Sequence, residues 1–293
     1  MTGVQTCALP IYYKKLLIIP LAMFLIAMIM IGMKVASTGD FINRGVSLKG
    51  GSTITISNTD VTIEEAKTIL SEELSNFDTN VRALTKGTIV SGIIIEASAT
   101  EIEEINQFTD VLKNEMGLTD DQYTIETMGS SLGESFFRQT FRALIIAFIF
   151  MAIVVFIYFK SFIPSIAVVL AALSDMVVTL AVVNALDIKM TTAGIAAFLM
   201  LIGYSVDTDI LLTTRVLKKR KGNVPESIIS AMKTGMTMTL STLVAVTIAL
   251  FVAESEVLKQ IMLIVFIGLI VDIINTWIQN AGIIRWYVEK KLK

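Results

Sequence analysis

The sequence predicts a membrane protein: an all-α bundle of six transmembrane helices that carries one extracytoplasmic α+β domain. Three observations lead to this fold class. Hydrophobic residues make up 54% of the 293-residue chain and charged residues only 17%, whereas a soluble domain carries about 25% charged residues. Six apolar runs are long enough to cross a bilayer. One stretch of ordinary globular composition separates the first run from the second.

The six apolar runs are candidates for transmembrane helices. A helix needs about 20 apolar residues to cross ~30 Å of hydrocarbon, and its backbone groups bond internally, as lipid requires. No amphipathic stripe separates polar from apolar faces, which excludes buried helices of a large soluble core. The runs are Leu16–Met33, Ala143–Phe159, Pro164–Leu186, Thr191–Thr213, Met236–Ala253 and Ile261–Ile283. The predicted organisation is a first transmembrane helix at 12–33, an outer domain at 34–142, five further transmembrane helices within 143–284 and a cytoplasmic tail at 285–293.

The first eleven residues, MTGVQTCALPI, read as the in-frame translation of a sequencing-adapter oligonucleotide. The alternative is a divergent natural N-terminus. We expect residues 1–11 to be a sequencing-adapter artefact and set them aside from the fold. On this interpretation Cys7 and Pro10 have no biological role.

The distribution of basic residues predicts the orientation in the cell membrane. Cytoplasmic loops carry an excess of Lys and Arg, and alternating spans place thirteen basic residues on one side. The short loops of the other side hold Lys189 and Lys259 beside Asp187, Glu254 and Glu256. Both termini are therefore predicted to be cytoplasmic. The thirteen are Lys14, Lys15, Lys160, Arg215, Lys218, Lys219, Arg220, Lys221, Lys233, Arg285, Lys290, Lys291 and Lys293.

The stretch from Lys34 to Arg142 predicts a folded outer domain. It holds 9 basic and 17 acidic residues, a net charge of 9 − 17 = −8. Strands are expected at Gly51–Ser57, Asn80–Leu84, Thr88–Ala97 and Gln122–Thr127, with a turn at Lys86-Gly87. Capping boxes at Thr62/Glu65 and Thr100/Glu103 predict the starts of two helices, the second ended by Gly117. The order βαββαβ favours a ferredoxin-like domain, and the glutamates of its helices are expected to form a solvated face.

Four acidic residues fall within the predicted spans: Asp175, Asp207, Asp209 and Asp272. An ionisable residue inside a membrane is costly and is a functional candidate by default, so we predict all four as proton-coupling candidates. Asp207 and Asp209 are two residues apart, so a helix points them about 200° from each other. One of these two could instead be solvated from the inner side or paired with Arg215.

Other interpretations of the polar residues stay open. Asp272 and Asn275 could form a hydrogen bond between helices. Small hydroxyl residues of the fourth and fifth spans could serve close helix packing or hydrate a proton path. These hydroxyl residues are Thr191, Thr192, Ser205, Thr237, Thr239, Ser241, Thr242 and Thr247.

Several function classes are excluded. The chain has no histidine, which removes imidazole catalysis and histidine metal ligation. It carries no nucleotide-binding loop, metal-ligand spacing or nucleophile–base arrangement, so we expect no cofactor, no metal and no enzymatic activity. The basic run Arg215–Lys221 directly follows a span and is interpreted as a positive-inside anchor touching anionic lipid rather than as a nucleic-acid site.

Three segments, together with the ALSD stretch ending at Asp175, resemble the SecD/SecF family within the resistance-nodulation-division superfamily. The segment GVSLKGGSTITI (45–56) is similar to the Gly-Gly segment that opens the family's outer domain. The segment IGYSVDTDILLTTRVLKKRKGN (202–223) is the most specific match. The segment TGMTMTLSTLVAVTIALF (234–251) is similar to the Thr/Ser-rich fifth span. The resemblance covers nearly everything from Lys34 to the C-terminus.

The chain departs from the bacterial SecF pattern at two places. Residues 205–208 read Ser-Val-Asp-Thr where bacterial sequences read Ser-Ile-Asn-Asp. Asp207 therefore takes the place of the asparagine and matches an acid of SecD. Thr234, with Lys233 beside it, replaces an arginine early in the fifth span. Lys233 and Arg215 are the candidate charge partners of the acids, and the differences suit the separately encoded archaeal-type subunit.

The resemblance implies an accessory subunit of the Sec protein-export apparatus. Its expected partners are a SecD-like subunit, the Sec translocon, translocating polypeptide chains and the lipid bilayer. The implied mechanism couples proton flow through Asp207 or Asp209, with Asp175, to movement of the outer domain. The alternative is an oligomeric exporter of small solutes or lipids from the same superfamily, and a third possibility is a purely structural assembly factor.

Overall fold

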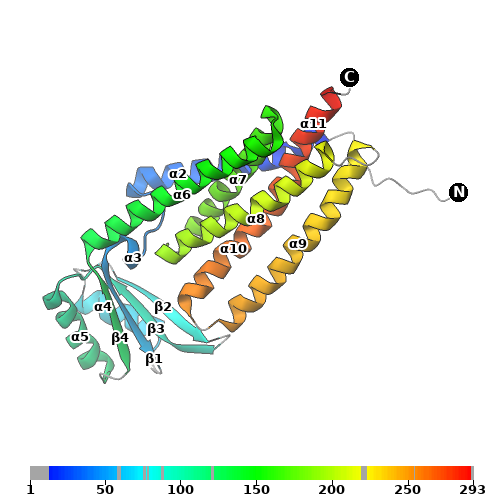
Figure 1. Cartoon of the computed structure of the whole chain (residues 1–293). Coiled ribbons are helices and arrows are strands. Elements are labelled where there is room, and N and C mark those ends of the chain that lie inside the picture. The colour runs from blue at the N-terminus through cyan, green and yellow to red at the C-terminus, as the bar shows by residue number, and fades with distance from the viewer. Residues whose placement is uncertain are drawn as a thin grey trace.

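The computed structural model describes residues 13–57, 61–74, 77, 79–86, 89–119, 122–218, 223–253 and 255–291. Some residues on which the sequence predictions depend lie wholly or partly outside these ranges. They are residues 1–11, the Lys86-Gly87 turn, Glu254 and the basic residues Lys219, Arg220, Lys221 and Lys293. Within the described part of the chain, six helices or runs of helices are long and apolar enough to cross a membrane. A small domain with an antiparallel sheet is attached at one end of the bundle (Figure 1).

The membrane helices follow the predicted runs but extend beyond several of them. The second run becomes a helix that begins at Ser130, well before Ala143, because its polar first turns continue past the hydrocarbon and are supported by the Glu134–Arg138 ion pair at 2.7 Å. The elements are α1 (Tyr13–Leu16), α2 (Ile18–Thr38), α6 (Ser130–Phe159), α7 (Phe162–Ala185), α8 (Thr192–Leu217), α9 (Val224–Val252), α10 (Glu256–Ile274), the π-helix η1 (Asn275–Asn280) and α11 (Ala281–Lys291).

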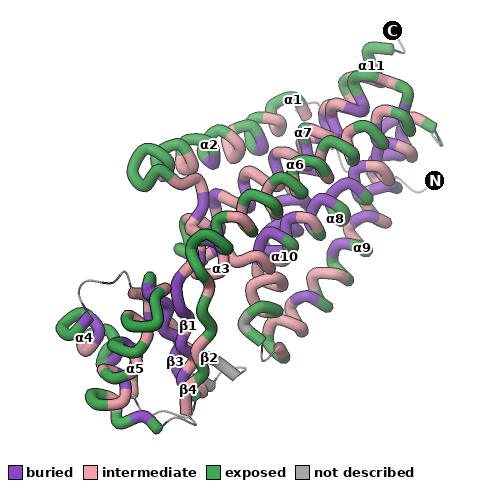
Figure 2. The backbone as a smooth tube through the Cα atoms, turned by 60° about the vertical axis from the view of Figure 1, so that its left-hand side comes forward, coloured by how far each residue is buried: buried purple, intermediate pink, exposed green. Residues whose placement is uncertain are grey.

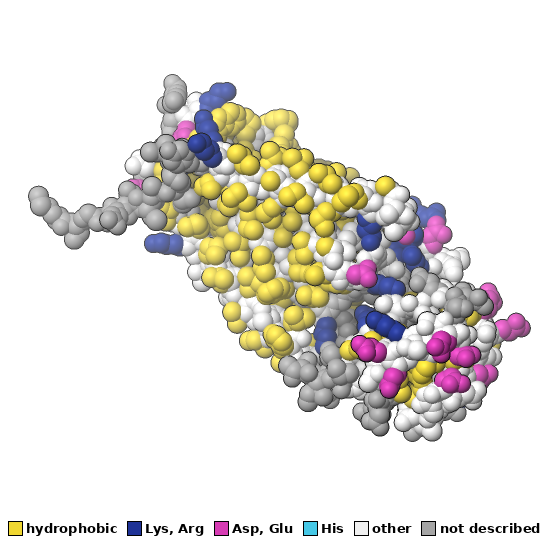
Figure 3. All heavy atoms as spheres, turned by 180° about the vertical axis from the view of Figure 1, so that it is seen from behind, with side chains coloured by type: hydrophobic (Ala, Val, Ile, Leu, Met, Phe, Trp, Pro, Cys, Tyr) yellow, Lys and Arg dark blue, Asp and Glu magenta, His cyan; other side chains and the backbone are white. Residues whose placement is uncertain are grey.

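The bundle has an inner and an outer layer. Helices α7, α8 and α10 pack on one another and hold most of the buried residues, whereas α2, α6 and α9 are mostly exposed (Figure 2). The exposed faces are apolar, as on Ile26, Phe150 and Val244, and Figure 3 shows a broad belt of hydrophobic side chains across one face of the bundle. Such a belt suits lipid as solvent.

The outer domain has the predicted βαββαβ order. Its elements are β1 (Gly51–Ser57), α4 (Ile63–Glu73), β2 (Thr79–Lys86), β3 (Ile89–Ala97), α5 (Ile102–Met116) and β4 (Tyr123–Met128), preceded by the short helix α3 (Val46–Lys49). The four strands form an antiparallel sheet in the order β2-β3-β1-β4. Ile54, Ile95, Leu70 and Phe108 meet in the core between this sheet and its two helices. The ferredoxin-like α+β prediction is confirmed.

The helix starts of the outer domain test the capping predictions. The box at Thr62/Glu65 is confirmed, because each side chain bonds the other residue's backbone N–H. The predicted box at Thr100/Glu103 is wrong by one residue. Glu104 accepts the backbone N–H of Thr100 at 2.9 Å and of Glu101 at 3.1 Å. Packing of Phe108 and Leu112 against the sheet fixes the helix register, and one carboxylate then reaches both free amides.

Two connections hold the outer domain on the bundle. Before α3, the backbone of residues 43–45 pairs with that of Met190, through Met190 N–H to Asn43 O at 2.5 Å and Gly45 N–H to Met190 O at 2.8 Å. Gly50 then has a φ of +90°, and a Cβ atom there would lie 2.3 Å from the Cα of Ser130. Only glycine fits this crossing, so the chain entering the domain and the chain leaving it are fixed against each other.

Candidate functional site

Three of the four predicted acids meet in the centre of the bundle. Asp175 comes from α7, Asp209 from α8 and Asp272 from α10, and each is at most 1% exposed. The three helices pack on one another, so the carboxyl groups share one interior. Within the part of the chain that the structure describes, no Lys or Arg forms an ion pair with any of them.

Hydroxyl and amide groups surround these carboxyl groups. Asp175 accepts hydrogen bonds from Ser205 Oγ at 2.5 Å and from Asn275 Nδ2 at 2.7 Å. Asp209 accepts from Asn280 Nδ2 at 2.7 Å. Thr208 Oγ1 lies 3.2 Å from Asp272 Oδ2. The site is therefore polar inside an apolar bundle, and its donors are neutral.

Thr276 joins two of the acids. Its Oγ1 lies 3.0 Å from Asp209 Oδ1 and 3.0 Å from Asp272 Oδ1. A threonine hydroxyl carries one hydrogen and can accept another, so it can donate to only one of the two carboxyl groups at a time. Asp175 is linked to Asp272 through Ser205 and Thr208, because Ser205 Oγ donates to Asp175 and Thr208 Oγ1 lies 2.9 Å from the backbone oxygen of Ser205 and 3.2 Å from Asp272 Oδ2. The three acids thus form one connected chain.

The π-helix η1 places the amides of this site. In a regular α-helix, residues five apart point about 140° from each other. The wider turn of η1 brings both Asn275 and Asn280 to the acids, the first to Asp175 and the second to Asp209. Single π turns within α-helices are frequent at functional sites.

Several buried oxygens on α7, α8 and η1 lack a partner among the described residues. They are Asp209 Oδ2, Asn275 Oδ1, Asn280 Oδ1, and the hydroxyls of Thr179 and Thr213. Buried polar atoms are normally satisfied. An oxygen left open in this way can accept a further hydrogen bond.

Asp207 lies apart from the other three acids. It is exposed on the face of α8 opposite to Asp209, as their two-residue spacing requires. Arg215 donates to Ser230 on α9, with both contacts at 2.8 Å, and not to an acid within the described residues. Lys233 is exposed on α9. The structure therefore brings together Asp175, Asp209 and Asp272, and separates Asp207, Arg215 and Lys233 from them.

Sequence reasoning missed two members of the site, Thr276 and Asn280. Polar residues recur at 272, 275, 276 and 280 within the last apolar run. Their presence could have been noticed, but their common orientation depends on the π turn, which the residue pattern does not reveal.

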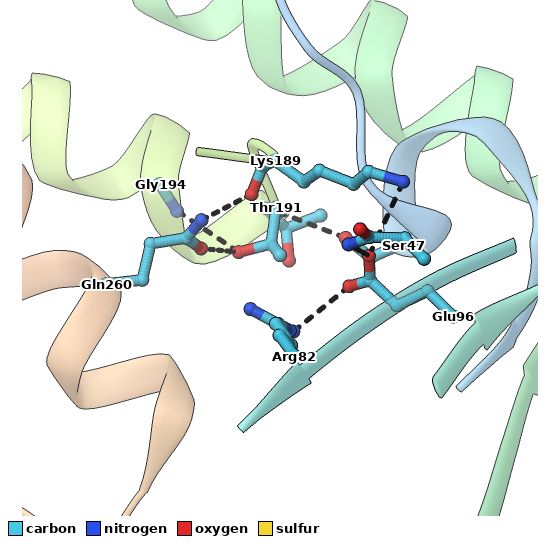
Figure 4. A network of polar contacts seen from close by, with 9 residues as sticks. Ser47, Arg82, Glu96, Lys189, Thr191, Gly194 and Gln260 are labelled. Atoms are coloured by element: carbon cyan, nitrogen blue, oxygen red, sulfur yellow. Dashed lines mark hydrogen bonds and ion pairs between the residues drawn. The ribbon is translucent and has the colours of Figure 1, made fainter. Parts of the chain in front are cut away.

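A second polar network connects the bundle to the outer domain (Figure 4). Glu96 of β3, 4% exposed, lies 3.0 Å from Arg82 and 3.8 Å from Lys189 of the α7–α8 loop. Gln260 of α10 donates to the backbone oxygen of Lys189 at 2.6 Å and accepts from Thr191. The helices that carry the acids are thus linked by side chains to the sheet.

Comparisons with known proteins identify relatives along nearly the whole chain. Residues 107–290 match the family described as protein export membrane protein SecD/SecF, C-terminal. The protein-export membrane protein SecF of Pyrococcus furiosus is 39% identical over 279 residues, covering 95% of this chain and 92% of that protein. The SecF of Methanocaldococcus jannaschii is 37% identical and covers 95% of this chain and 96% of that protein.

The fold also matches a solved structure. The crystal structure of SecDF from Thermus thermophilus, described as a translocon-associated membrane protein, superposes with a TM-score of 0.77 at 19% identity. The match covers 98% of this chain but only 40% of the SecDF chain. This likeness concerns the fold.

Proposed function

The chain belongs to the SecD/SecF family of protein-export membrane proteins, and we propose that it is the SecF-type subunit of a protein-export apparatus in the cell membrane. It is a multi-pass membrane protein whose role is in protein export. The observation that carries the mechanistic part of the proposal is the buried chain of Asp175, Asp272 and Asp209. We assign it to the uptake and release of protons.

The energetics of burial support this assignment. Three ionised carboxylates close together and away from water, with no cation beside them among the described residues, would repel one another at a cost of several kcal/mol. Binding protons removes that cost. A site of this kind therefore holds protons while it is closed and can release them when water or a cation approaches.

Thr276 is the proposed step between two acids. When Asp272 is protonated, it donates its hydrogen to Thr276 Oγ1, and Thr276 passes its own hydrogen to Asp209. One O–H bond breaks and one forms at the threonine, so the hydroxyl is unchanged afterwards. The open oxygen of Asp209, Oδ2, is free to receive a second hydrogen bond on the far side.

The exposed face of α8 is the proposed contact with a SecD-like subunit. It presents Ala196, Met200, Gly203, Tyr204 and Asp207, spaced so that they form one stripe. Asp207 would be costly against lipid, and small residues beside it allow close helix approach. A partner helix that supplies a hydrogen-bonding group would satisfy Asp207.

The network around Glu96 and Lys189 is the proposed route from the proton site to the outer domain. Helix α10 carries both Asp272 and Gln260, and Gln260 holds the backbone of Lys189. A shift of α10 on proton release would move Lys189 relative to Glu96. With both termini cytoplasmic, this movement lies outside the cell, where it could act on polypeptides leaving the Sec translocon.

The first experiment separates proton coupling from the family role. Asp175→Asn and Asp209→Asn, in the full chain with its partner, are expected to lower secretion of a reporter and proton flux into vesicles at least tenfold. Asp110→Asn, an exposed acid of α5, is the control and should change neither. Normal secretion by both variants would refute proton coupling while leaving the export role intact.

A second experiment tests the partner. The full chain with a C-terminal tag is purified gently from native membranes, and the co-purifying proteins are identified by mass spectrometry. Recovery of a SecD-like subunit supports the proposal. Recovery of only this chain as a homo-oligomer would instead favour an exporter of small solutes or lipids.

A further inference from the structure

An apolar groove lies between the peripheral helices of the bundle. Helices α2 and α6 each pack against α7, and the space among the three measures about 360 Å³, within the ~300–1,000 Å³ range of small-ligand sites. All of its lining side chains are apolar, among them Met28 of α2, Leu144 of α6 and Leu180 of α7. Phe137 and Phe141 of α6 also line it.

A basic cavity adjoins this groove. It measures about 430 Å³, and Phe137 and Phe141 line both spaces. Its remaining lining is Arg44, Arg138 and Arg142 together with Glu134, Ile145 and Ile146. Three arginines therefore gather beside the apolar groove, and Figure 3 shows Lys and Arg side chains along the boundary between the hydrophobic belt and the outer domain.

The three arginines differ in their interaction partners. Arg44 is paired with Asp40 at 2.6 Å and stacks over the ring of Phe137 at 5.1 Å. Arg138 pairs with Glu134 on the surface, with both side chains more than 60% exposed, so that pair contributes little and can exchange its partner. Arg142 is exposed and makes no hydrogen bond or ion pair within the part of the chain that the structure describes.

The position of Arg142 along α6 indicates how deep its side chain lies in the membrane. It lies about 26 Å from Phe159, the last residue of the helix, at 1.5 Å per residue. This is close to the ~30 Å thickness of the hydrocarbon core. The guanidinium groups of Arg142 and Arg138 therefore lie at the level of the lipid headgroups, and the groove beneath them lies at the level of the acyl chains.

We propose that this groove and the arginines beside it form a binding site for one anionic phospholipid of the outer leaflet. The acyl chain lies in the groove among α2, α6 and α7. The phosphate lies between Arg142 and Arg138, because a guanidinium fork binds phosphate through paired hydrogen bonds. Arg44, already held by Asp40 and Phe137, closes the site on the side of the outer domain.

The competing explanation is a layer of exchangeable lipid without preference for headgroup charge. That explanation accounts for an apolar groove but not for an unpaired arginine in the adjoining cavity. Charge complementarity therefore favours an anionic headgroup over a zwitterionic one. Each arginine near the surface contributes about a fivefold preference.

The test uses the purified full chain, reconstituted in vesicles of phosphatidylcholine with a minor fraction of phosphatidylglycerol and then released for native mass spectrometry. The wild type is expected to retain phosphatidylglycerol in preference to phosphatidylcholine. Arg142→Gln should lower that preference about fivefold, and Arg138→Gln with Arg142→Gln should abolish it. Lys67→Gln, on an outer-domain helix, removes the same charge elsewhere and should have no effect.

A second pair of variants tests the groove itself. Met28 is 49% exposed and lines the groove, so Met28→Trp should fill it and lower phosphatidylglycerol retention while the fold persists. Ile29, 60% exposed and outside the groove lining, supplies the matched control Ile29→Trp. Equal retention of both lipids by the wild type, or the same retention in Met28→Trp as in Ile29→Trp, would overturn the proposal.

Discussion

The outer domain and the membrane bundle distribute their residues in opposite ways. The outer domain buries isoleucine, leucine and phenylalanine between its sheet and helices and exposes most of its acids. The bundle exposes apolar side chains all around and buries Asp175, Asp209 and Asp272 with their hydroxyl and amide partners. Apolar residues thus lie inside the outer domain and on the outside of the bundle, and these acids show the opposite distribution.

The difference shows which force holds each part together. In water, the apolar core of the outer domain gains free energy by leaving the solvent, at about 25 cal/mol per Å². In lipid, the surroundings are as apolar as the side chains, so helix association depends on packing and on hydrogen bonds between helices. The buried polar cluster of the bundle is therefore both its proposed functional site and a part of its cohesion.

The largest expected difference comes from the same substitution made in both regions. Phe108→Ala in the outer domain should lower the free energy of unfolding by about 3–5 kcal/mol, because Phe108 is 1% exposed in the core. Phe150→Ala on the lipid-facing side of α6, where Phe150 is 63% exposed, should change stability little. Denaturant unfolding in detergent measures both, and equal losses would contradict the comparison.

Removing an acid tests cohesion in the bundle. Asp209→Leu leaves the donor Asn280 Nδ2 without its acceptor, at a cost of about 1–3 kcal/mol, whereas Thr276 Oγ1 can still donate to Asp272. Asp209→Asn keeps the shape and should cost less. Thermal unfolding of the two variants, compared with that of Asp207→Leu at the exposed position, ranks the three substitutions by their loss of stability. A more stable Asp209→Leu protein would mean that the cluster serves function alone.

The junction should respond less strongly than either core. Glu96→Gln weakens the contacts to Arg82 and Lys189, which are partly exposed, and should lower stability by about 1 kcal/mol. If the network transmits movement, secretion should fall by more than the loss of stability alone would cause. Lys49→Gln, an exposed charge of the same junction, is the control. A loss of stability with unchanged secretion would limit Glu96 to a structural role.

The smallest expected effect is a pH dependence confined to the outer domain. Hydrogen bonds from backbone amides at the helix starts hold the pKa of Glu65 and of Glu104 below the ordinary 4.5. A depressed native pKa stabilises the domain above the unfolded value, and this contribution is lost as the pH falls through the native value. Unfolding followed from pH 6 downward should show it, and Glu65→Gln with Glu104→Gln should remove that part of the dependence.

The sequence predicted most of the architecture because its signals are local. Run length and hydrophobicity identified the spans, and alternation with capping residues identified the strands and helices of the outer domain. The second capping box was displaced by one residue because packing of Phe108 and Leu112 set the register of α5. The start of α6 at Ser130 was missed because a helix continues beyond the hydrocarbon wherever its polar turns are stable.

The sequence by itself determined which residues are costly in a membrane, since charge and polarity are properties of single side chains. It also determined that Asp207 and Asp209 face opposite ways, because that follows from helical periodicity. Only the tertiary structure decided which of the two joins Asp175 and Asp272, and that a π turn brings Asn275 and Asn280 to them. These facts depend on how three helices pack and how one turn widens, and both are set by contacts between residues far apart in the chain.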